Sequence, residues 1–193
     1  MKRNISTGIL ALSSLFLANQ VIASDGIVHF RGEVVDTTCE VTSDTAGQTV
    51  NIGKVGKTAF TGIDSTASVK DFHIRLDNCP STYTQAAVRF DGTEDKDSIG
   101  KGYLAIGTPV AGETGTDGTF TGGETAVAAT GVAIKLYNLK DDTAVPLYGN
   151  SAYSPITAGT ADLGFKAKYV QTLATVTPGT ANADSQFTIE YLK

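Results

Sequence analysis

The chain has 193 residues, a formal net charge of −5 and 21 glycines, a length that favours a single domain. Because phosphate binding needs clustered Lys and Arg, an acidic chain without a basic stripe argues against nucleic acid as a partner. Beyond the N-terminus, no stretch approaches the roughly 20 apolar residues of a membrane helix.

Residues 1 to 23 have the pattern of an export signal. Lys2 and Arg3 precede an apolar run at residues 9 to 17, and the aliphatic or small residues at positions 21 to 23 predict cleavage before Ser24. The apolar run is too short to cross a bilayer core of about 30 Å. We therefore expect an exported, soluble mature protein that begins at Ser24.

Residues 26 to 34 are predicted to form an alternating strand, with Ile27, His29, Arg31 and Glu33 on one face. The apolar face holds Gly26, Val28, Phe30, Gly32 and Val34. Such a strand must bury this face against other apolar groups. Periodicity alone leaves two interpretations open: the first strand of a self-contained sandwich, or a strand that lies in the groove of another chain.

Further alternating segments predict strands along the rest of the chain, and no window has helical periodicity. The predicted strands cover residues 50–52, 72–76, 86–90, 132–136, 165–170 and 187–191. Together with the frequent glycine-containing turns, they predict an all-β fold, most simply a sandwich. The Gly- and Thr-rich stretch from residue 107 to residue 131 predicts a surface loop or irregular hairpin.

Cys39 and Cys79 are the two cysteines of the chain. An even number of cysteines in an exported protein favours a disulfide over free thiols or a metal site. Closing a loop of this length would restrict the unfolded chain by roughly 4 kcal/mol in the chain-entropy treatment. We therefore predict a Cys39–Cys79 disulfide.

Several short motifs lack residues that a phosphate-binding, metal-binding or catalytic site would need. Gly56-Lys57-Thr58 lacks the first glycine of a phosphate-binding loop, because Asn51 stands there, so we predict a turn. The acidic run at residues 91–97 lacks the order of a calcium loop and predicts a solvated hairpin tip. His29 and His73 are predicted to be exposed strand positions. We expect no catalytic residues, no metal site and no cofactor.

The ends of the chain and the region around the second cysteine carry a resemblance to a known family. The segments are residues 28–35 before Cys39, residues 72–79, residues 165–169 and residues 187–191. Together they resemble a major pilin subunit of type 1-like chaperone–usher fimbriae. Members usually have Tyr second and Gly fourteenth from the end, whereas Tyr191 is third and Gly179 fifteenth. One extra residue after the tyrosine accounts for both shifts.

This resemblance implies an incomplete immunoglobulin-like sandwich that lacks its last strand and is completed by donor-strand exchange. It divides the chain into a signal peptide (1–23), a donor-strand extension (24–35) and a pilin domain (36–193). The implied site residues are the donor positions Val28, Phe30, Gly32 and Val34, and Gly179, Phe187, Ile189 and Tyr191 in the groove and chaperone-binding strand. Gly32 is expected to match a shallow site in the groove.

The function implied by the resemblance is that of a non-enzymatic structural subunit of a surface fimbria that supports cell adhesion. Its expected partners are other copies of itself, a periplasmic chaperone, an outer-membrane usher and a possible host-cell receptor. The protein would pass through the periplasm to the cell surface. A minor or adaptor subunit that binds a receptor directly stays open as the alternative.

Overall fold

The computed structural model describes residues 28–29, 31–32, 38–107 and 127–193. The chain divides into two compact units, Met1–Val35 and Asp36–Lys193. The predicted export signal and most of the predicted strand at 26–34 lie outside the described residues. The four described residues of that segment belong to no assigned strand.

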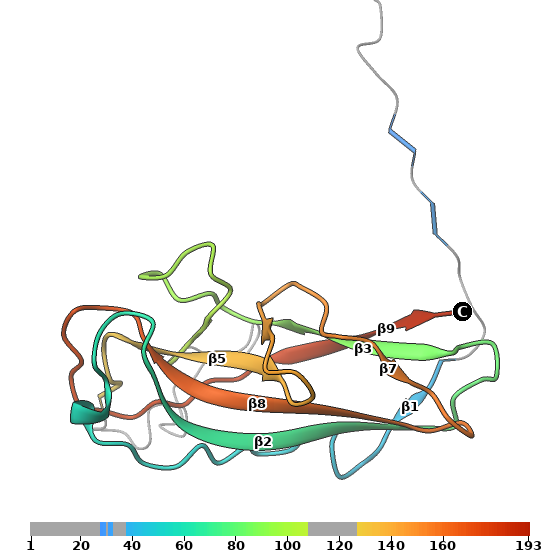
Figure 1. Cartoon of the computed structure of the whole chain (residues 1–193), viewed down its shortest axis with the longest axis horizontal. Coiled ribbons are helices and arrows are strands. Elements are labelled where there is room, and N and C mark those ends of the chain that lie inside the picture. Colours follow the sequence, from blue (N-terminus) through green and yellow to red (C-terminus); the bar gives the residue numbers. More distant parts are fainter. Residues whose placement is uncertain (1–27, 30, 33–37, 108–126) are drawn as a thin grey trace, which may run out of the picture. The chain divides into compact units, whose positions relative to one another are not determined.

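The second unit is a sandwich of two antiparallel sheets, as predicted (Figure 1). The larger sheet has the order β1-β2-β8-β5-β4, and β6 pairs with β5. Its strands are β1 (Glu40–Val41), β2 (Thr66–Asp77), β4 (Leu104–Ala105), β5 (Val132–Asn138), β6 (Ala144–Val145) and β8 (Ala161–Gln171). The smaller sheet has the order β7-β3-β9 and comprises β3 (Gln85–Asp91), β7 (Ser154–Pro155) and β9 (Gln186–Leu192).

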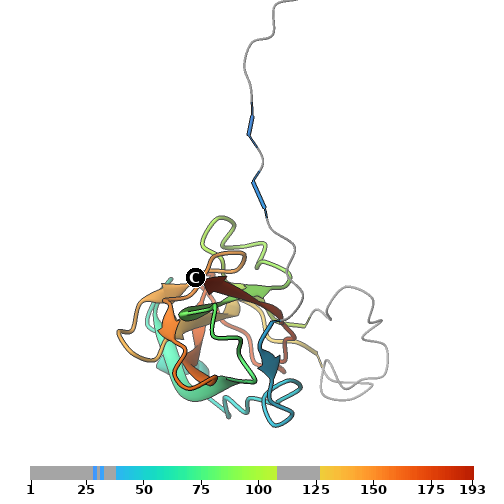
Figure 2. The same ribbon diagram turned by 90° about the vertical axis from the view of Figure 1, so that its right-hand side faces the viewer.

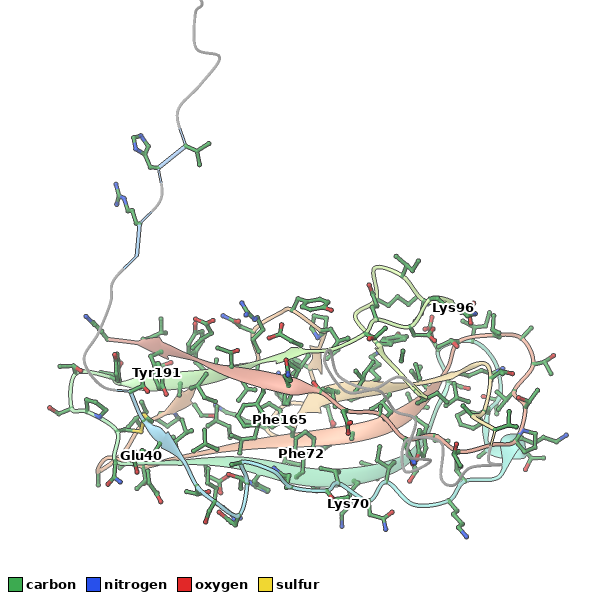
Figure 3. All side chains as sticks on the ribbon, turned by 180° about the vertical axis from the view of Figure 1, so that it is seen from behind. Glu40, Lys70, Phe72, Lys96, Phe165 and Tyr191 are labelled. Atoms are coloured by element: carbon green, nitrogen blue, oxygen red, sulfur yellow. A yellow bond between two sulfur atoms is a disulfide. The ribbon has the colours of Figure 1, made fainter. Side chains whose placement is uncertain are left out.

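Alternation places one face of each long strand in the core between the sheets. In β8, Leu163 and Phe165 are each only 1% exposed, whereas Lys166 between inward-facing residues is half-buried on the outer face. Phe165 packs against Phe72 of β2 and Phe90 of β3, with ring centroids 5.4 and 5.0 Å away. Figure 3 shows Phe72 and Phe165 directed into the space between the layers. These rings join the two sheets, and burying each large apolar side chain contributes about 1.5–3 kcal/mol.

The Cys39–Cys79 disulfide is present, which confirms the prediction. It links the residue before β1 to the segment that follows β2, and Glu40 and Val41 pair with Asp77 and Leu76 next to it. The two-residue strand β1 is thereby held on the edge of β2 by a covalent bond as well as by its ladder.

The prediction of a strand at residues 50–52 is wrong. Val50 and Ile52 are partly buried against the core, but this segment has no partner strand among the described residues. Side chains satisfy part of its backbone instead: the Gly53 amide donates to Asn51 Oδ1 at 3.0 Å, and Ser68 Oγ donates to the Ile52 carbonyl at 2.7 Å. The apolar alternation therefore indicates that these side chains are buried, but not that the segment pairs with another strand.

The predicted turns and loops also differ in detail from the structure. The turn at Gly56-Lys57-Thr58 contains the short 3₁₀ helix η1 (Lys57–Ala59). The acidic run is more ordered than a solvated tip, because Asp95 is buried and accepts a hydrogen bond from Ser98 Oγ at 2.9 Å. Of the loop predicted at 107–131, residues 108–126 lie outside the described part of the chain.

Replacing Phe165 by Ala should lower the free energy of unfolding by about 3–5 kcal/mol, because it leaves a cavity between Phe72 and Phe90. Phe72→Ala is a matched control in the same aromatic cluster, and it should cost less because Phe72 is only half-buried. Denaturant unfolding of the purified variants measures both changes. Equal costs at the two positions would contradict this assignment of the core.

Candidate functional site

The last strand, β9, is paired along one edge only. Its seven residues form an antiparallel ladder with β3, from Gln85 opposite Leu192 to Asp91 opposite Gln186. In the sheet order β7-β3-β9 it is the outermost strand, and within the described ranges no strand pairs with its other edge. Figure 2 shows the two layers from the end at which the C-terminus lies. An open edge presents unpaired N–H and C=O groups, which are a template for another strand.

The inward face of β9 is incompletely covered. Phe187, Ile189 and Tyr191 pack against the core but are only half-buried. In β8, by contrast, the inward-facing Leu163 and Phe165 are fully buried. The core is therefore fully covered along β8, whereas the inward-facing side chains of β9 remain partly exposed beside its open edge.

The half-buried stripe extends beyond β9 in the chain. Ala181 and Ala183 continue the alternation upstream of Phe187 and are also half-buried against the core. Val50 and Ile52, from the segment that follows β1, are half-buried against the same core. The two alanines were not among the predicted site residues, although the continued alternation before Phe187 is a signal that could have found them.

Tyr191 connects the end of β9 to the start of the domain. Its ring stacks on Tyr83 with the centroids 4.6 Å apart. Burial raises the pKa of the Tyr191 phenol, whereas hydrogen bonds with the Cys39 backbone and the Thr38 side chain act in the opposite direction. The phenol thus contacts the segment that carries the disulfide, and Figure 3 shows Tyr191 and Glu40 at the same end of the sandwich.

Three of the four residues predicted for the groove strand lie together on β9: Phe187, Ile189 and Tyr191. Gly179 lies before β9 and is exposed. A Cβ atom on Gly179 would stand only 2.3 Å from the Ala129 backbone nitrogen, so the residue is small because another backbone segment passes beside it. The structure gives Gly179 a packing role at this point and does not place it on the strand.

Of the predicted donor positions, Val28 and Gly32 are described. Val28 is 75% exposed, and a Cβ atom on Gly32 would meet no other atom within 4 Å. Phe30 and Val34 lie outside the described residues. Among the described residues, Val28 is therefore largely exposed, and the position of a Gly32 side chain is open space.

One of the two histidines singled out in the sequence forms a surface pair. His73, predicted to be simply exposed, contacts Asp162 with Nδ1 and Oδ1 2.6 Å apart. Among the described residues, no group of three or more His, Cys, Asp or Glu side chains could hold a metal ion. In the same part of the chain, no helix has the length and apolar character needed to cross a membrane.

Comparison with known proteins gives a consistent result over nearly the whole chain. The profile of the family described as fimbrial protein matches residues 28–192. A probable major fimbrial subunit of Escherichia coli O157:H7 is 34% identical over 95% of this chain and 95% of its own length. A type 1 fimbrial subunit of Salmonella typhimurium is 32% identical over 99% of this chain and its full length.

Solved structures with a similar fold include further pilus proteins. A type I fimbria protein of Burkholderia pseudomallei is 30% identical, with a TM-score of 0.54 over 81% of this chain and 91% of its own. The rod subunit of the P pilus is 18% identical, with a TM-score of 0.60 over 81% of this chain and 100% of its own. At this lower identity, the second comparison supports the fold alone.

Replacing Tyr191 by Phe should make the chain lose less stability as the pH rises. Because burial raises the pKa of Tyr191 above its ordinary value of 10.0, the folded chain holds this proton more tightly than the unfolded chain. This contribution to stability is complete below the unfolded pKa and is lost as the pH rises through the folded pKa. Thermal unfolding between about pH 9 and 11 should therefore show a smaller decrease in Tm for Tyr191→Phe than for the unmodified chain. Equal decreases would contradict the buried phenol.

Proposed function

Because the chain belongs to the fimbrial protein family, we propose that it is a structural subunit of a surface fimbria whose copies join head to tail by strand insertion. The observation that carries this proposal is the open edge of β9 beside the half-buried face of Phe187, Ile189 and Tyr191. A fold with this edge is completed by one added strand. The role requires no catalytic group and no cofactor.

The strand that completes β9 is the extension at residues 24–35 of a neighbouring copy. Its alternating residues Val28, Phe30 and Val34 would supply the apolar cover that the half-buried face of β9 lacks. Each would contribute on the order of 1.5–3 kcal/mol by leaving water, and backbone pairing would satisfy the edge of β9. This is recognition by strand addition. Because a strand of one copy enters the edge of the next, the contact is heterologous and does not close, which gives a filament.

Before assembly, the same edge needs a temporary partner. An exposed edge strand with an apolar face invites aggregation, so a periplasmic chaperone would cover it after export directed by residues 1–23. An outer-membrane usher would then exchange the chaperone for the extension of the next copy. The finished fibre would lie on the cell surface and support adhesion, with a host-cell receptor as its possible target.

Periplasmic expression of the chain with and without its chaperone tests the proposal directly. The full mature chain and a form that lacks residues 24–35 should both depend on the chaperone for stability, because both have the open β9 edge. Only the full form should yield polymers, measured by electron microscopy and by sedimentation. A monomer that is stable without a chaperone, with the edge filled by a strand of its own body, would overturn the proposal.

Gly32→Leu should leave the chaperone complex intact but stop fibre growth, because the larger side chain would not fit a shallow site on the acceptor copy. Arg31→Leu introduces the same residue on the opposite face of the same strand and should permit growth. Co-purification with the chaperone and fibre length are the two measurements. Normal fibres from Gly32→Leu would remove this glycine from the mechanism.

A further inference from the structure

The outer face of the larger sheet carries two pairs of like charges in direct register. Lys135 of β5 stands opposite Lys168 of β8, and Glu40 of β1 stands opposite Asp77 of β2. All four side chains lie on the face away from the core, because their neighbours Leu136, Ala167, Val41 and Leu76 face inward. Like charges directly opposite each other on a sheet are destabilising.

The lysine pair has no directly bound carboxylate within the described part of the chain. Neither Lys135 nor Lys168 forms an ion pair there, and the carboxylates of Asp64 and Asp142 are bound by Lys101 at 2.6 Å and by Lys166 at 2.7 Å. Tyrosine rings support the two ammonium groups instead. Lys135 Nζ lies 5.2 Å from the Tyr103 ring centroid and 5.0 Å from that of Tyr137, and Lys168 Nζ lies 4.5 Å from that of Tyr137. Cation–π contacts hold the charges in place without cancelling them.

The carboxylate pair is equally uncompensated. Glu40 and Asp77 are both exposed, and Glu40 Oε2 accepts a hydrogen bond from Asn78 Nδ2 at 2.8 Å. Within the described residues, neither carboxylate lies within ion-pair distance of Lys, Arg or His. The nearby guanidinium of Arg75 is directed to Asp44, 2.8 Å away, and to Asp162, 3.6 Å away.

The two pairs are too far apart to neutralise each other in one molecule. Leu76 pairs with Ala161 at one end of β8, and Lys168 lies near the other end. At about 3.3 Å per residue, the separation along the sheet is about 25 Å. Exposed charges at this distance are screened, because the Debye length at 0.1 M salt is only about 10 Å.

We propose that these two pairs form a second contact between copies of this chain, in which Lys135 and Lys168 of one copy meet Glu40 and Asp77 of another. The proposal rests on the fibre assembly described above, but it uses the outer face of the larger sheet, whereas strand insertion uses the edge of β9. Bringing the pairs together turns two repulsions into an attraction and fixes which surfaces meet. The contact is again heterologous, so it repeats from copy to copy.

Zero-length carbodiimide cross-linking of fibres assembled from the full chain tests this contact. The reagent joins a lysine amine to a carboxylate with loss of water, and mass spectrometry identifies the joined peptides. Links from Lys135 or Lys168 to Glu40 or Asp77 must be intermolecular because of the distance along the sheet. They should form in fibres, be absent from the chaperone-bound subunit, and fall at least ~threefold at about 1 M salt, where the Debye length is about 3 Å.

Three variants test this contact further. Asp77→Asn removes one of the two carboxylates and should reduce the Glu40–Lys168 link several-fold. Asp184→Asn is the matched control, because it makes the same change at an exposed position outside both pairs, and it should leave the link unchanged. Reversing all four charges (K135E, K168E, E40K and D77K together) should restore the links with their polarity exchanged.

Intramolecular links between Lys101 and Asp64 and between Lys166 and Asp142 show that the reagent has worked. Fibres that form these internal links but not the proposed ones would overturn this contact and leave the proposed function standing. The same would follow if the proposed links were equally abundant in the chaperone-bound subunit. A chain that assembles no fibres would overturn both proposals.

Discussion

The structure depends on a ladder that is made along one edge of β9 and not along the other. β3 satisfies the inner edge over seven residues, whereas the outer edge has no strand partner among the described residues. For that reason Phe187, Ile189 and Tyr191 remain half-buried beside a closely packed aromatic cluster. One sandwich thus has both a packed core and an open strand edge. A strand added from another chain would cover this edge, and the same step would join the two chains.

Much of the fold could be predicted from the sequence, because the long strands contain alternating segments. The segments at 72–76, 86–90, 132–136, 165–170 and 187–191 all lie within strands, and the disulfide follows from cysteine number and export. The failures have two physical causes. Alternation reports which side chains are buried, and at Val50 and Ile52 burial occurs without a partner strand. The two-residue strands β1, β4, β6 and β7 are too short to carry any period.

The candidate site was predicted in part. Phe187, Ile189 and Tyr191 alternate within a strand and could be placed on one face. Gly179 lies outside β9, and its close approach to the Ala129 backbone could not be predicted from the sequence, because Ala129 is distant along the chain. The like-charge pairs could not be predicted from the sequence either. They depend on the register between β5 and β8 and between β1 and β2, which places Lys135 opposite Lys168 and Glu40 opposite Asp77.

The disulfide has a mechanical consequence. A fibre under tension would be pulled through the chain that precedes Cys39, and the first element met by that force is the two-residue strand β1, whose ladder alone would peel easily. The Cys39–Cys79 bond passes the force directly to the end of β2, which is twelve residues long and paired along most of its length with β8. Rupture would then require shearing many backbone hydrogen bonds together. In the proposed fibre, the covalent link would therefore give the subunit tensile strength at the point where the weakest strand would otherwise set the limit.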